Sequence, residues 1–211
     1  MQASTASVAS AIVLIILVIL IIYELRELFP PDPLTRTKYI ATPDGKRFRV
    51  HKQFRDAPAA AALLSYLDDR ATDLIRTLYH RYHDDPGPKG DAARRLLARY
   101  NPDNLVESSP DSAKKDTSYS IDKGAIIAMC LRSRDGSYRI HDMNLLTFVL
   151  IHELTHVAAD VNDHPPEFWR IFKFLLAEAE AGGIIRNEDY SKRPVEYCGL
   201  QVDFNPFFTK N

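Results

Sequence analysis

The most constraining stretch of this sequence is an apolar run that leads into two histidines and a glutamate. Residues 145–151 are nearly all aliphatic or aromatic, and His152, Glu153 and His156 follow at once. A run of this kind suits a helix that is buried on most sides. Residues four apart lie on one face of a helix, so His152 and His156 can present two imidazoles to one metal ion, with Glu153 beside them.

This spacing is the H-E-x-x-H pattern of zinc hydrolases, in which the histidines bind zinc and the glutamate acts on a water. Burying three such polar side chains is costly unless they have a partner, and a divalent cation is the obvious one. The helix can begin at Asp142 or Asn144, because either residue can cap it. We therefore expect one Zn²⁺ ion on His152 and His156.

The motif supplies two ligands, whereas a catalytic zinc ion uses three protein ligands and a water. We expect the third to be His164, which lies where the chain must turn before a new helix starts at Pro165. Asp160, one turn further along the face of the two histidines, is one alternative. Glu178 and Glu180, on the following helix, are the other.

The sequence here resembles the WLM/SprT-like zinc metallopeptidases, which are small minigluzincin-type domains. The resemblance is specific around His152-Glu-Leu-Thr-His156 and His164-Pro-Pro-Glu-Phe-Trp169. The family's third histidine usually comes two residues earlier, where this chain has Asn162. The resemblance implies zinc on the three histidines and Glu153 as the general base.

Flanking segments are similar to the WLM-like metallopeptidases that large DNA viruses encode, among them small membrane-anchored ones. These segments are Tyr100-Asn-Pro-Asp-Asn-Leu105, Thr117-Ser-Tyr119, Lys123-Gly124 and Cys130-Leu-Arg132. The resemblance covers about residues 95 to 200. We expect an α+β, zincin-like domain, in which a small and mostly antiparallel sheet packs on the helix of the motif, preceded by one N-terminal transmembrane helix.

That transmembrane helix is predicted from a second apolar run at the N-terminus. No charged side chain occurs in residues 1–23, and Val8 to Tyr23 is almost wholly aliphatic. About 20 residues of helix reach roughly 30 Å, enough to span a bilayer. A cleaved signal peptide is the alternative, but it would need a basic start, which is missing. We predict a tail at 1–7, an anchor at 8–28, a proline-rich linker at 29–37 and one metallopeptidase domain at 38–211.

The charges next to the apolar run indicate an orientation. Arg26, Arg36 and Lys38 all follow it, so the positive-inside rule places the N-terminus outside and the catalytic domain in the cytosol. The membrane could belong to a virion or to the inside of a host cell. Cys130 and Cys198 are too few for a disulfide framework, and we expect two free buried thiols rather than a single bridge.

The overall charge restricts the classes of binding partner that we expect. The 27 basic and 28 acidic side chains give a net charge of −1, which argues against a broad nucleic-acid-binding face. We therefore expect a protein or peptide substrate, a lipid bilayer at the N-terminal helix, and no nucleic acid. The sequence indicates no oligomeric state.

Turn signals and periodicity divide the rest of the chain. Pro43-Asp-Gly45 predicts a hairpin between residues 38–42 and 46–51. An apolar stripe predicts a long helix from Asp56 to about Tyr82. The further expected elements are a break at 84–90, a helix at 92–100, a polar loop at 101–117, a strand at 119–131, a turn at 133–137 into a strand at 138–141, and a helix from Pro165 to Ala181 that Gly182-Gly183 ends.

One part of the sheet is expected to bind the substrate. In a zinc peptidase, a sheet edge above the active-site helix normally receives the substrate as an added strand. Residues 124–131 are our candidate for this edge, and a purely internal strand is the alternative. The residues expected to contact the substrate are Gly124, Ile126 and Ala128.

The expected chemistry is peptide-bond hydrolysis. Glu153 would act as general base on a water that zinc acidifies, and would return the proton to the leaving amine. A tyrosine of the C-terminal tail, Tyr197 or Tyr190, could stabilise the oxyanion, with simple packing as its alternative role. A second hypothesis is a catalytically silent protein of this fold that serves in structure or assembly, at a membrane or in a viral particle.

Overall fold

The computed structural model describes residues 11–21, 37–108 and 117–209, and the chain divides into two compact units, Met1–Thr35 and Arg36–Asn211. In the first unit, residues 11–21 form a helix whose side chains from Ile12 to Ile21 are each 46–63 % exposed. Across the described residues, we find no helix with both the length and the apolar character that a membrane crossing requires. The predicted tail lies outside the described residues, as do most of the linker and both ends of the predicted anchor.

The second unit has the expected α+β composition, but its sheet is mixed. Five strands run in the order β1-β2-β3-β5-β4. The outer pairs β1–β2 and β4–β5 are antiparallel, whereas β2–β3 and β3–β5 are parallel, so the prediction of a mostly antiparallel sheet is wrong. The strands are β1 (Thr37–Ala41), β2 (Arg47–His51), β3 (Leu105–Glu107), β4 (Tyr119–Ile121) and β5 (Ile126–Met129).

The strand predicted at 138–141 is only an isolated bridge between Arg132 and Ile140, and two further predictions fail for local reasons. Strand β3 lies in the predicted loop at 101–117, because its three residues are buried between polar segments and are too few to show a period. The single strand predicted at 119–131 is a hairpin of β4 and β5. Its turn contains Asp122, Lys123 and Gly124, all with positive φ. A Cβ at Gly124 would lie 3.1 Å from Cγ2 of Val157, so the turn needs glycine to approach the helix of the motif.

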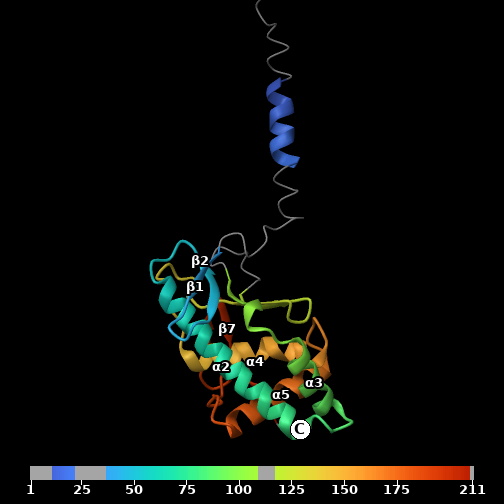
Figure 1. Cartoon of the computed structure of the whole chain (residues 1–211). Coiled ribbons are helices and arrows are strands. Elements are labelled where there is room, and N and C mark those ends of the chain that lie inside the picture. The colour runs from blue at the N-terminus through green and yellow to red at the C-terminus, as the bar shows by residue number, and fades with distance from the viewer. Residues whose placement is uncertain (1–10, 22–36, 109–116, 210–211) are drawn as a thin grey trace, which may run out of the picture. The chain divides into compact units, whose positions relative to one another are not determined.

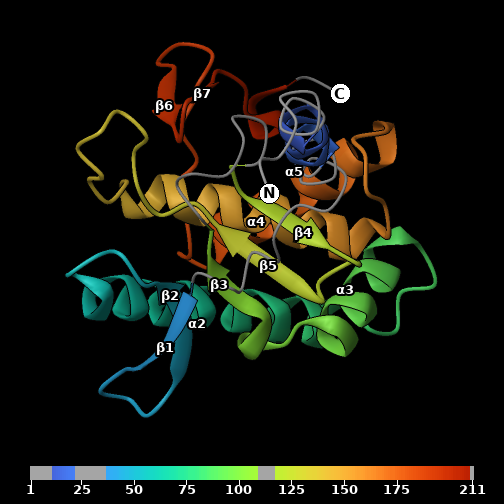
Figure 2. The same cartoon turned by 90° about the horizontal axis from the view of Figure 1, so that it is seen from above.

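Four helices lie on one side of this sheet (Figures 1 and 2), with β1 to β3 against α2 and with β4 and β5 against α4. The predicted stripe of α2 is buried from Leu63 to Leu78, which confirms it as core. The short helix begins at Pro88 rather than at 92, since proline is preorganised for the first helical turn. The helices are α2 (Ala57–Tyr82), α3 (Pro88–Arg99), α4 (Met143–Ala159) and α5 (Pro166–Ala181).

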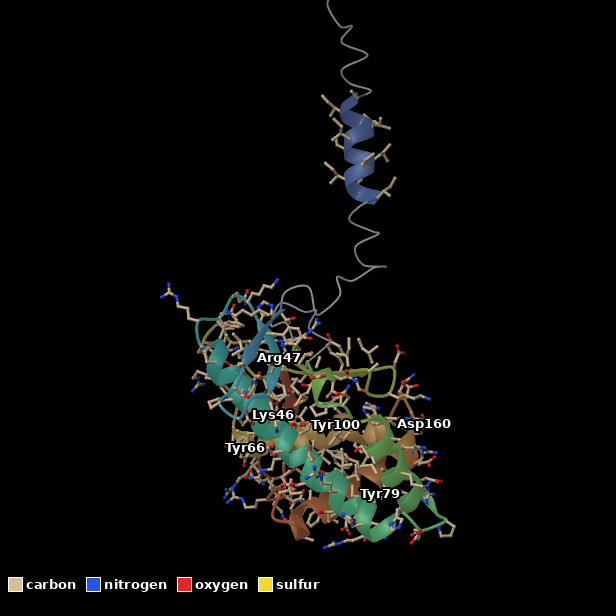
Figure 3. All side chains as sticks on the ribbon, in the orientation of Figure 1. Lys46, Arg47, Tyr66, Tyr79, Tyr100 and Asp160 are labelled. Carbon is tan, nitrogen blue, oxygen red and sulfur yellow. A yellow bond between two sulfur atoms is a disulfide. The ribbon has the colours of Figure 1, made fainter. Side chains whose placement is uncertain are left out.

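A buried acidic residue ties the predicted β1–β2 hairpin to the helices. Asp68 of α2 is 2 % exposed, and its carboxylate accepts hydrogen bonds from Lys46 Nζ (2.8 Å) and from the hydroxyl of Tyr100 (2.8 Å). Lys46 belongs to the hairpin and Tyr100 follows α3, and both are marked in Figure 3. One carboxylate therefore connects α2 both to the β1–β2 hairpin and to the residue that follows α3.

Helix α4 is the centre of the fold and carries the motif. Its N-cap is Asp142, whose side chain accepts hydrogen bonds from the backbone N–H groups of Asn144 (2.9 Å) and Leu145 (3.2 Å). The helix packs against α2, α3, α5 and the β4–β5 hairpin, so most of its surface is buried, as its apolar sequence predicts. At its other end, Asp160 adopts the left-handed conformation (φ 61°) and turns the chain.

The C-terminal region contains a hairpin that the sequence did not reveal. Strands β6 (Val195–Tyr197) and β7 (Leu200–Val202) pair with each other across a turn at Cys198 and Gly199. The prediction of free thiols is wrong, because Cys198 forms a disulfide with Cys130 at the end of β5. The two cysteines are 68 residues apart in sequence, and only the folded chain brings their Cα atoms to 6.5 Å. Short 3₁₀ helices, η2 (Pro102–Asn104) and η3 (Pro206–Phe208), complete the fold.

Candidate metal centre

Three histidines meet beside α4 and form what we call the histidine cluster: His152, His156 and His164. One ligand nitrogen from each lies within 4.8 Å of those of the other two. Two Nε2 atoms, those of His152 and His164, are 3.0 Å apart. The first two side chains project from successive turns of α4, and the third comes from the loop between α4 and α5. Sequence periodicity accounts for the pair on the helix, and the loop conformation accounts for the third.

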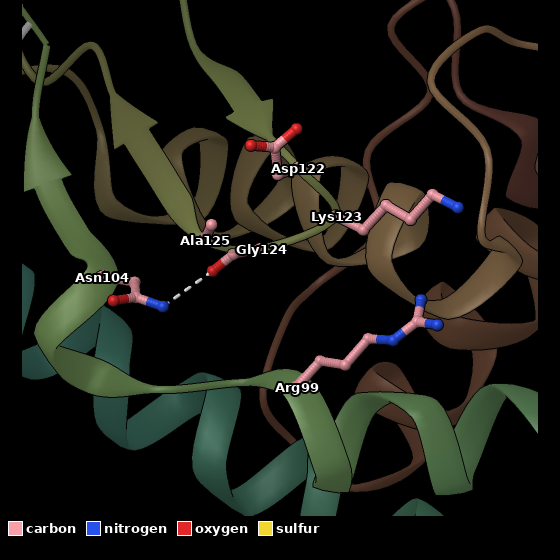
Figure 4. A pocket seen from close by; sticks show the side chains of 6 residues that line it. All are labelled: Arg99, Asn104, Asp122, Lys123, Gly124 and Ala125. Carbon is pink, nitrogen blue, oxygen red and sulfur yellow. Dashed lines mark hydrogen bonds between the residues drawn. The ribbon is translucent and has the colours of Figure 1, made fainter. Parts of the chain in front are cut away.

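Asp160 shapes this loop and is not a member of the cluster. Its carboxylate pairs with Nη1 of Arg99 (2.7 Å) and Nζ of Lys123 (2.8 Å). These two cations, seen in Figure 4, lower the pKa of Asp160 to about 2 through their hydrogen bonds and charges. With this residue in the left-handed conformation, the chain folds back so that the Val161 carbonyl meets the ring of His156 (3.0 Å). Asp160 thus positions the loop that carries His164.

The two glutamates of α5 are also engaged elsewhere. Glu178 accepts hydrogen bonds from the hydroxyl of Tyr82 (2.7 Å) and from Arg81 (2.6 Å), which connects α5 to α2. Glu180 accepts one from the backbone N–H of Asn187 (3.0 Å). The structure therefore brings neither of these alternative ligands to the histidine cluster.

Aromatic rings surround the cluster. Phe168 is fully buried, and its ring centroid lies 4.5–5.0 Å from those of all three histidines. Trp169 stacks on the ring of His164 (5.6 Å, 30°), and its indole N–H donates to the carbonyl of the same residue (3.0 Å). Phe172 covers the ring of His152 from α5. These contacts fix the ring orientations and exclude water from one side of the cluster.

The imidazoles are held in the neutral form, which is the form that binds metals. Burial, and the neighbouring charges of the other two rings, lower the pKa of His152 to about 3. Burial also lowers the pKa values of His156 and His164. The hydrogen-bond network assigns a proton to Nδ1 of His156, which donates to the Val161 carbonyl and leaves Nε2 free to face the cluster. No motif could reveal this contact, since every residue has a backbone carbonyl.

Glu153 lies next to the cluster and is 3 % exposed. Burial raises the pKa of its carboxyl group to about 8. Burial is the cause of this shift, and no hydrogen bond or charge of the described residues lowers the pKa again. A buried glutamate without a partner is costly, and such groups concentrate at functional sites.

The donor set fits one zinc ion. Three imidazoles are a common ligand set of catalytic zinc and leave a fourth position for water. Two nitrogens bound at about 2.1 Å in tetrahedral geometry would lie roughly 3.4 Å apart. The separation of 3.0 Å between Nε2 of His152 and Nε2 of His164 is close to this value. A shift of a few tenths of an ångström would bring the two rings to that spacing.

The residues predicted to bind substrate do not lie on a sheet edge. Strand β5 has neighbours on both sides, where Ile126 pairs with Ile121 of β4, and Ala128 pairs with Tyr119 of β4 and with Val106 of β3. The edge next to α4 is β4, so the assignment of the edge to residues 124–131 is wrong. The periodicity of a strand shows which faces are buried, whereas its neighbours depend on the whole sheet.

Gly124, the first of the predicted substrate contacts, lines a small pocket beside this hairpin (Figure 4). Its carbonyl accepts a hydrogen bond from Nδ2 of Asn104 (2.9 Å). None of the three histidines lines the pocket, which has a volume of about 360 Å³. The pocket is lined by Arg99, Asn104, Asp122, Lys123, Gly124 and Ala125.

The two tyrosines considered for oxyanion binding have structural contacts. The hydroxyl of Tyr197 donates to the carbonyl of Cys130 (2.9 Å) and lies 2.5 Å from Oγ of Ser118. The ring of Tyr190 packs edge-on against Phe148 (5.0 Å). Both side chains are at least 97 % buried. Packing, the alternative role, accounts for the contacts of both.

Comparisons with known proteins give viral relatives of undescribed function. No family model matches the chain. It is 46 % identical over 99 residues to uncharacterized protein R325 of Acanthamoeba polyphaga mimivirus, covering 47 % of this chain and 49 % of that protein. It is 36 % identical over 67 residues to uncharacterized protein 136R of Invertebrate iridescent virus 6, covering 32 % and 38 %. The chain thus matches about half or less of the length of these relatives.

Among solved structures, the chain is similar to the crystal structure of a Wss1 mutant from Saccharomyces cerevisiae. The TM-score is 0.47 and the sequence identity 16 %, and the match covers 63 % of this chain and 86 % of that one.

Proposed function

We propose that this chain is a zinc-dependent metallopeptidase. The observation that carries the proposal is the meeting of three neutral imidazoles, from His152, His156 and His164, beside the buried carboxyl group of Glu153. The family resemblance of the motif supports the same activity. When bound, a zinc ion would acidify a water and polarise a peptide carbonyl.

In this proposal Glu153 is the general base. In its ionised form Glu153 takes a proton from the attacking water and then passes it to the leaving amine, and burial, which raises its pKa, makes this carboxylate a stronger base. Phe168 and Trp169 keep the histidine rings in place and shield one side of the cluster. Holding the rings still avoids reorganisation during the reaction.

The substrate in this proposal lies along β4. Among the described strands, β4 (Tyr119–Ile121) has a partner on one side only, and it lies on the part of the sheet that packs on α4. The outer backbone N–H and C=O groups of an edge strand can pair with an extended peptide. Strand β1 is the other edge, but it packs against α2 rather than α4.

Zinc stoichiometry and cleavage of an unbiased peptide library test the proposal together. The parent should bind one zinc ion and cleave peptides, Glu153→Gln should bind zinc without cleaving, and His164→Ala should lose most of both. His80→Ala is the matched control, because His80 is an exposed histidine of α2 outside the cluster. Zinc binding without any cleavage by the parent would favour the silent structural protein, and absence of zinc binding would contradict both functions.

We also propose that the N-terminal run anchors the protein in a membrane. The charge-free sequence of residues 1–23 and the exposed apolar side chains of the helix at 11–21 support this. The predicted orientation places the catalytic domain in the cytosol, whereas disulfides are typical of oxidising compartments. The viral relatives suggest the membrane of a virion or of an infected cell. Carbonate extraction and protease protection of the full chain would test anchoring and orientation separately.

A further inference from the structure

The segment from Val195 to Phe204, which we call the C-terminal wall, makes two contacts around the candidate metal centre, one with the aromatic shell of the cluster and one with the start of β4. The first is at Phe204, whose ring packs edge-on against Trp169 (5.3 Å, 87°). Trp169 in turn stacks on His164 (5.6 Å). Phe204 is 44 % exposed, so it borders the site at the surface. One end of the wall therefore adjoins the third histidine of the cluster.

The second contact is at Tyr197, whose buried hydroxyl lies 2.5 Å from Oγ of Ser118 and donates to the carbonyl of Cys130 (2.9 Å). The Tyr197 hydroxyl joins a ring of hydrogen bonds in which the backbone N–H of Cys130 donates to Oγ of Ser118 (2.9 Å). Ser118 directly precedes β4, so the same contacts connect the wall to the start of the proposed substrate strand.

Besides the main chain itself, the Cys130–Cys198 disulfide is a covalent cross-link between this wall and the end of β5. Strands β6 and β7 have three residues each, and within the described chain they pair only with each other. An isolated two-stranded hairpin is marginal at best in water. Weak contacts from His141 add to the link, since its Nε2 accepts a hydrogen bond from the backbone N–H of Cys198 (3.3 Å). The disulfide thus acts together with the hydrogen bonds of Tyr197 and with those of Asn205, which follows Phe204 and donates to Asn187 and Glu188, in holding the wall in position.

We propose that the Cys130–Cys198 disulfide positions the C-terminal wall at the active site and thereby makes the activity redox-dependent. This inference rests on the proposed peptidase function. None of the three histidines belongs to the wall, so its release should leave zinc binding intact. Loss of the wall would displace Phe204 from Trp169 and Tyr197 from the start of β4, and cleavage should slow while the metal remains bound.

The chemical step is a two-electron exchange. A dithiol reductant is oxidised to its own disulfide, or a phosphine to its oxide with the oxygen of a water, while the S–S bond breaks and takes up two electrons and two protons to give two thiols. The reverse step needs a two-electron oxidant, such as the disulfide of another protein. A domain that faces the cytosol would keep both thiols reduced. The proposal therefore links activity to the compartment that the protein occupies.

The first experiment compares oxidised and phosphine-reduced full-length protein. Trp169 is the sole tryptophan of the chain, so its fluorescence reports directly on its contact with Phe204. Reduction should shift this emission and lower kcat/KM roughly 10- to 100-fold, with zinc content unchanged. The Cys130→Ser/Cys198→Ser variant should resemble the reduced parent and ignore the reductant. Unchanged emission and unchanged cleavage on reduction would overturn the proposal.

A second variant tests the contact between the wall and Trp169 without changing the disulfide. Phe204→Ala should change the Trp169 emission and lower kcat/KM with the disulfide intact. Phe208→Ala is its matched control, because Phe208 is equally exposed (45 %) but packs on Phe207 instead. If the oxidised parent cleaves no peptide, the peptidase function fails. The response of Trp169 to reduction then still decides whether the disulfide holds the wall.

Discussion

Two regions of the molecule bury titratable side chains, and they offset the free-energy cost of this burial in different ways. In one, which we call the arginine cluster, Arg132 donates to Glu107 (2.8 Å) and to Asp56 (2.7 Å). Glu107 also accepts the backbone N–H of His51 (2.7 Å). In the other, the histidine cluster and Glu153 bury imidazoles and a carboxyl group, and no hydrogen bond or charge of the described residues lowers the raised pKa of that carboxyl group.

The difference shows how a site can be told from a structural cluster. A buried charge that its own chain neutralises is stable in the metal-free protein and needs nothing from outside. A set of neutral nitrogens that converge on one point, beside an unpaired carboxyl group, is completed by a partner from outside the chain. Four experiments test this contrast.

The largest effect is expected where the arginine cluster is broken on one side. Arg132→Met leaves Glu107 buried without its cation and should cost about 3–5 kcal/mol of unfolding free energy. The double variant Arg132→Met/Glu107→Leu should recover most of this loss, because no charge then remains buried. Urea unfolding of the metal-free proteins measures both. A double variant as unstable as the single one would show that the cluster has further essential partners.

The next effect concerns zinc and the histidine cluster. At 100 times its dissociation constant, zinc should stabilise the parent by about 2.7 kcal/mol. His164→Ala should lose most of this gain, whereas Arg132→Met should keep it despite its lower starting stability. Thermal or urea unfolding with and without zinc gives the comparison. Equal zinc stabilisation of the parent and His164→Ala would exclude His164 as a ligand.

A smaller effect is expected from pH in the metal-free protein. The folded pKa of Glu153, about 8, is above its ordinary value of 4.5, so its contribution to stability is complete below about pH 4.5 and is lost progressively as pH rises through 8. Stability relative to Glu153→Gln should fall by about 2 kcal/mol between pH 6 and pH 8. His152, with a pKa lowered to about 3, acts in the opposite sense and loses stability as pH falls below about 6.5. Parallel pH profiles of the parent and Glu153→Gln would contradict the raised pKa.

The smallest effect is expected at the exposed ion pairs of Asp160. Asp160→Asn keeps a residue that tolerates the left-handed conformation and removes the pairs with Arg99 and Lys123. The melting temperature should change by roughly 2 °C or less, since exposed pairs contribute little. Calorimetry measures this change. A large decrease would mean that these ion pairs, and not the backbone turn, hold the loop of His164.

Much of the fold follows from local patterns. The apolar stripe of α2, the continuous apolar run of α4 and the turn residues of the first hairpin each predict their elements correctly, because these signals depend on neighbours within a few residues. Strand β3 and the β6–β7 hairpin cannot be predicted from local patterns, because each of these strands has only three residues. Short strands are stabilised by partners that are distant in sequence, and their own composition shows little of this.

By itself, the sequence determined that His152, Glu153 and His156 share one buried helix, since 3.6 residues per turn fix that geometry locally. The tertiary structure decided which side chain joins them. Asp160 turns the chain so that His164 returns to the helix, while Glu178 and Glu180 are held by other partners. The tertiary structure also decided that the two cysteines pair and that β4 is the edge strand next to α4, because both features depend on how distant segments come together in space.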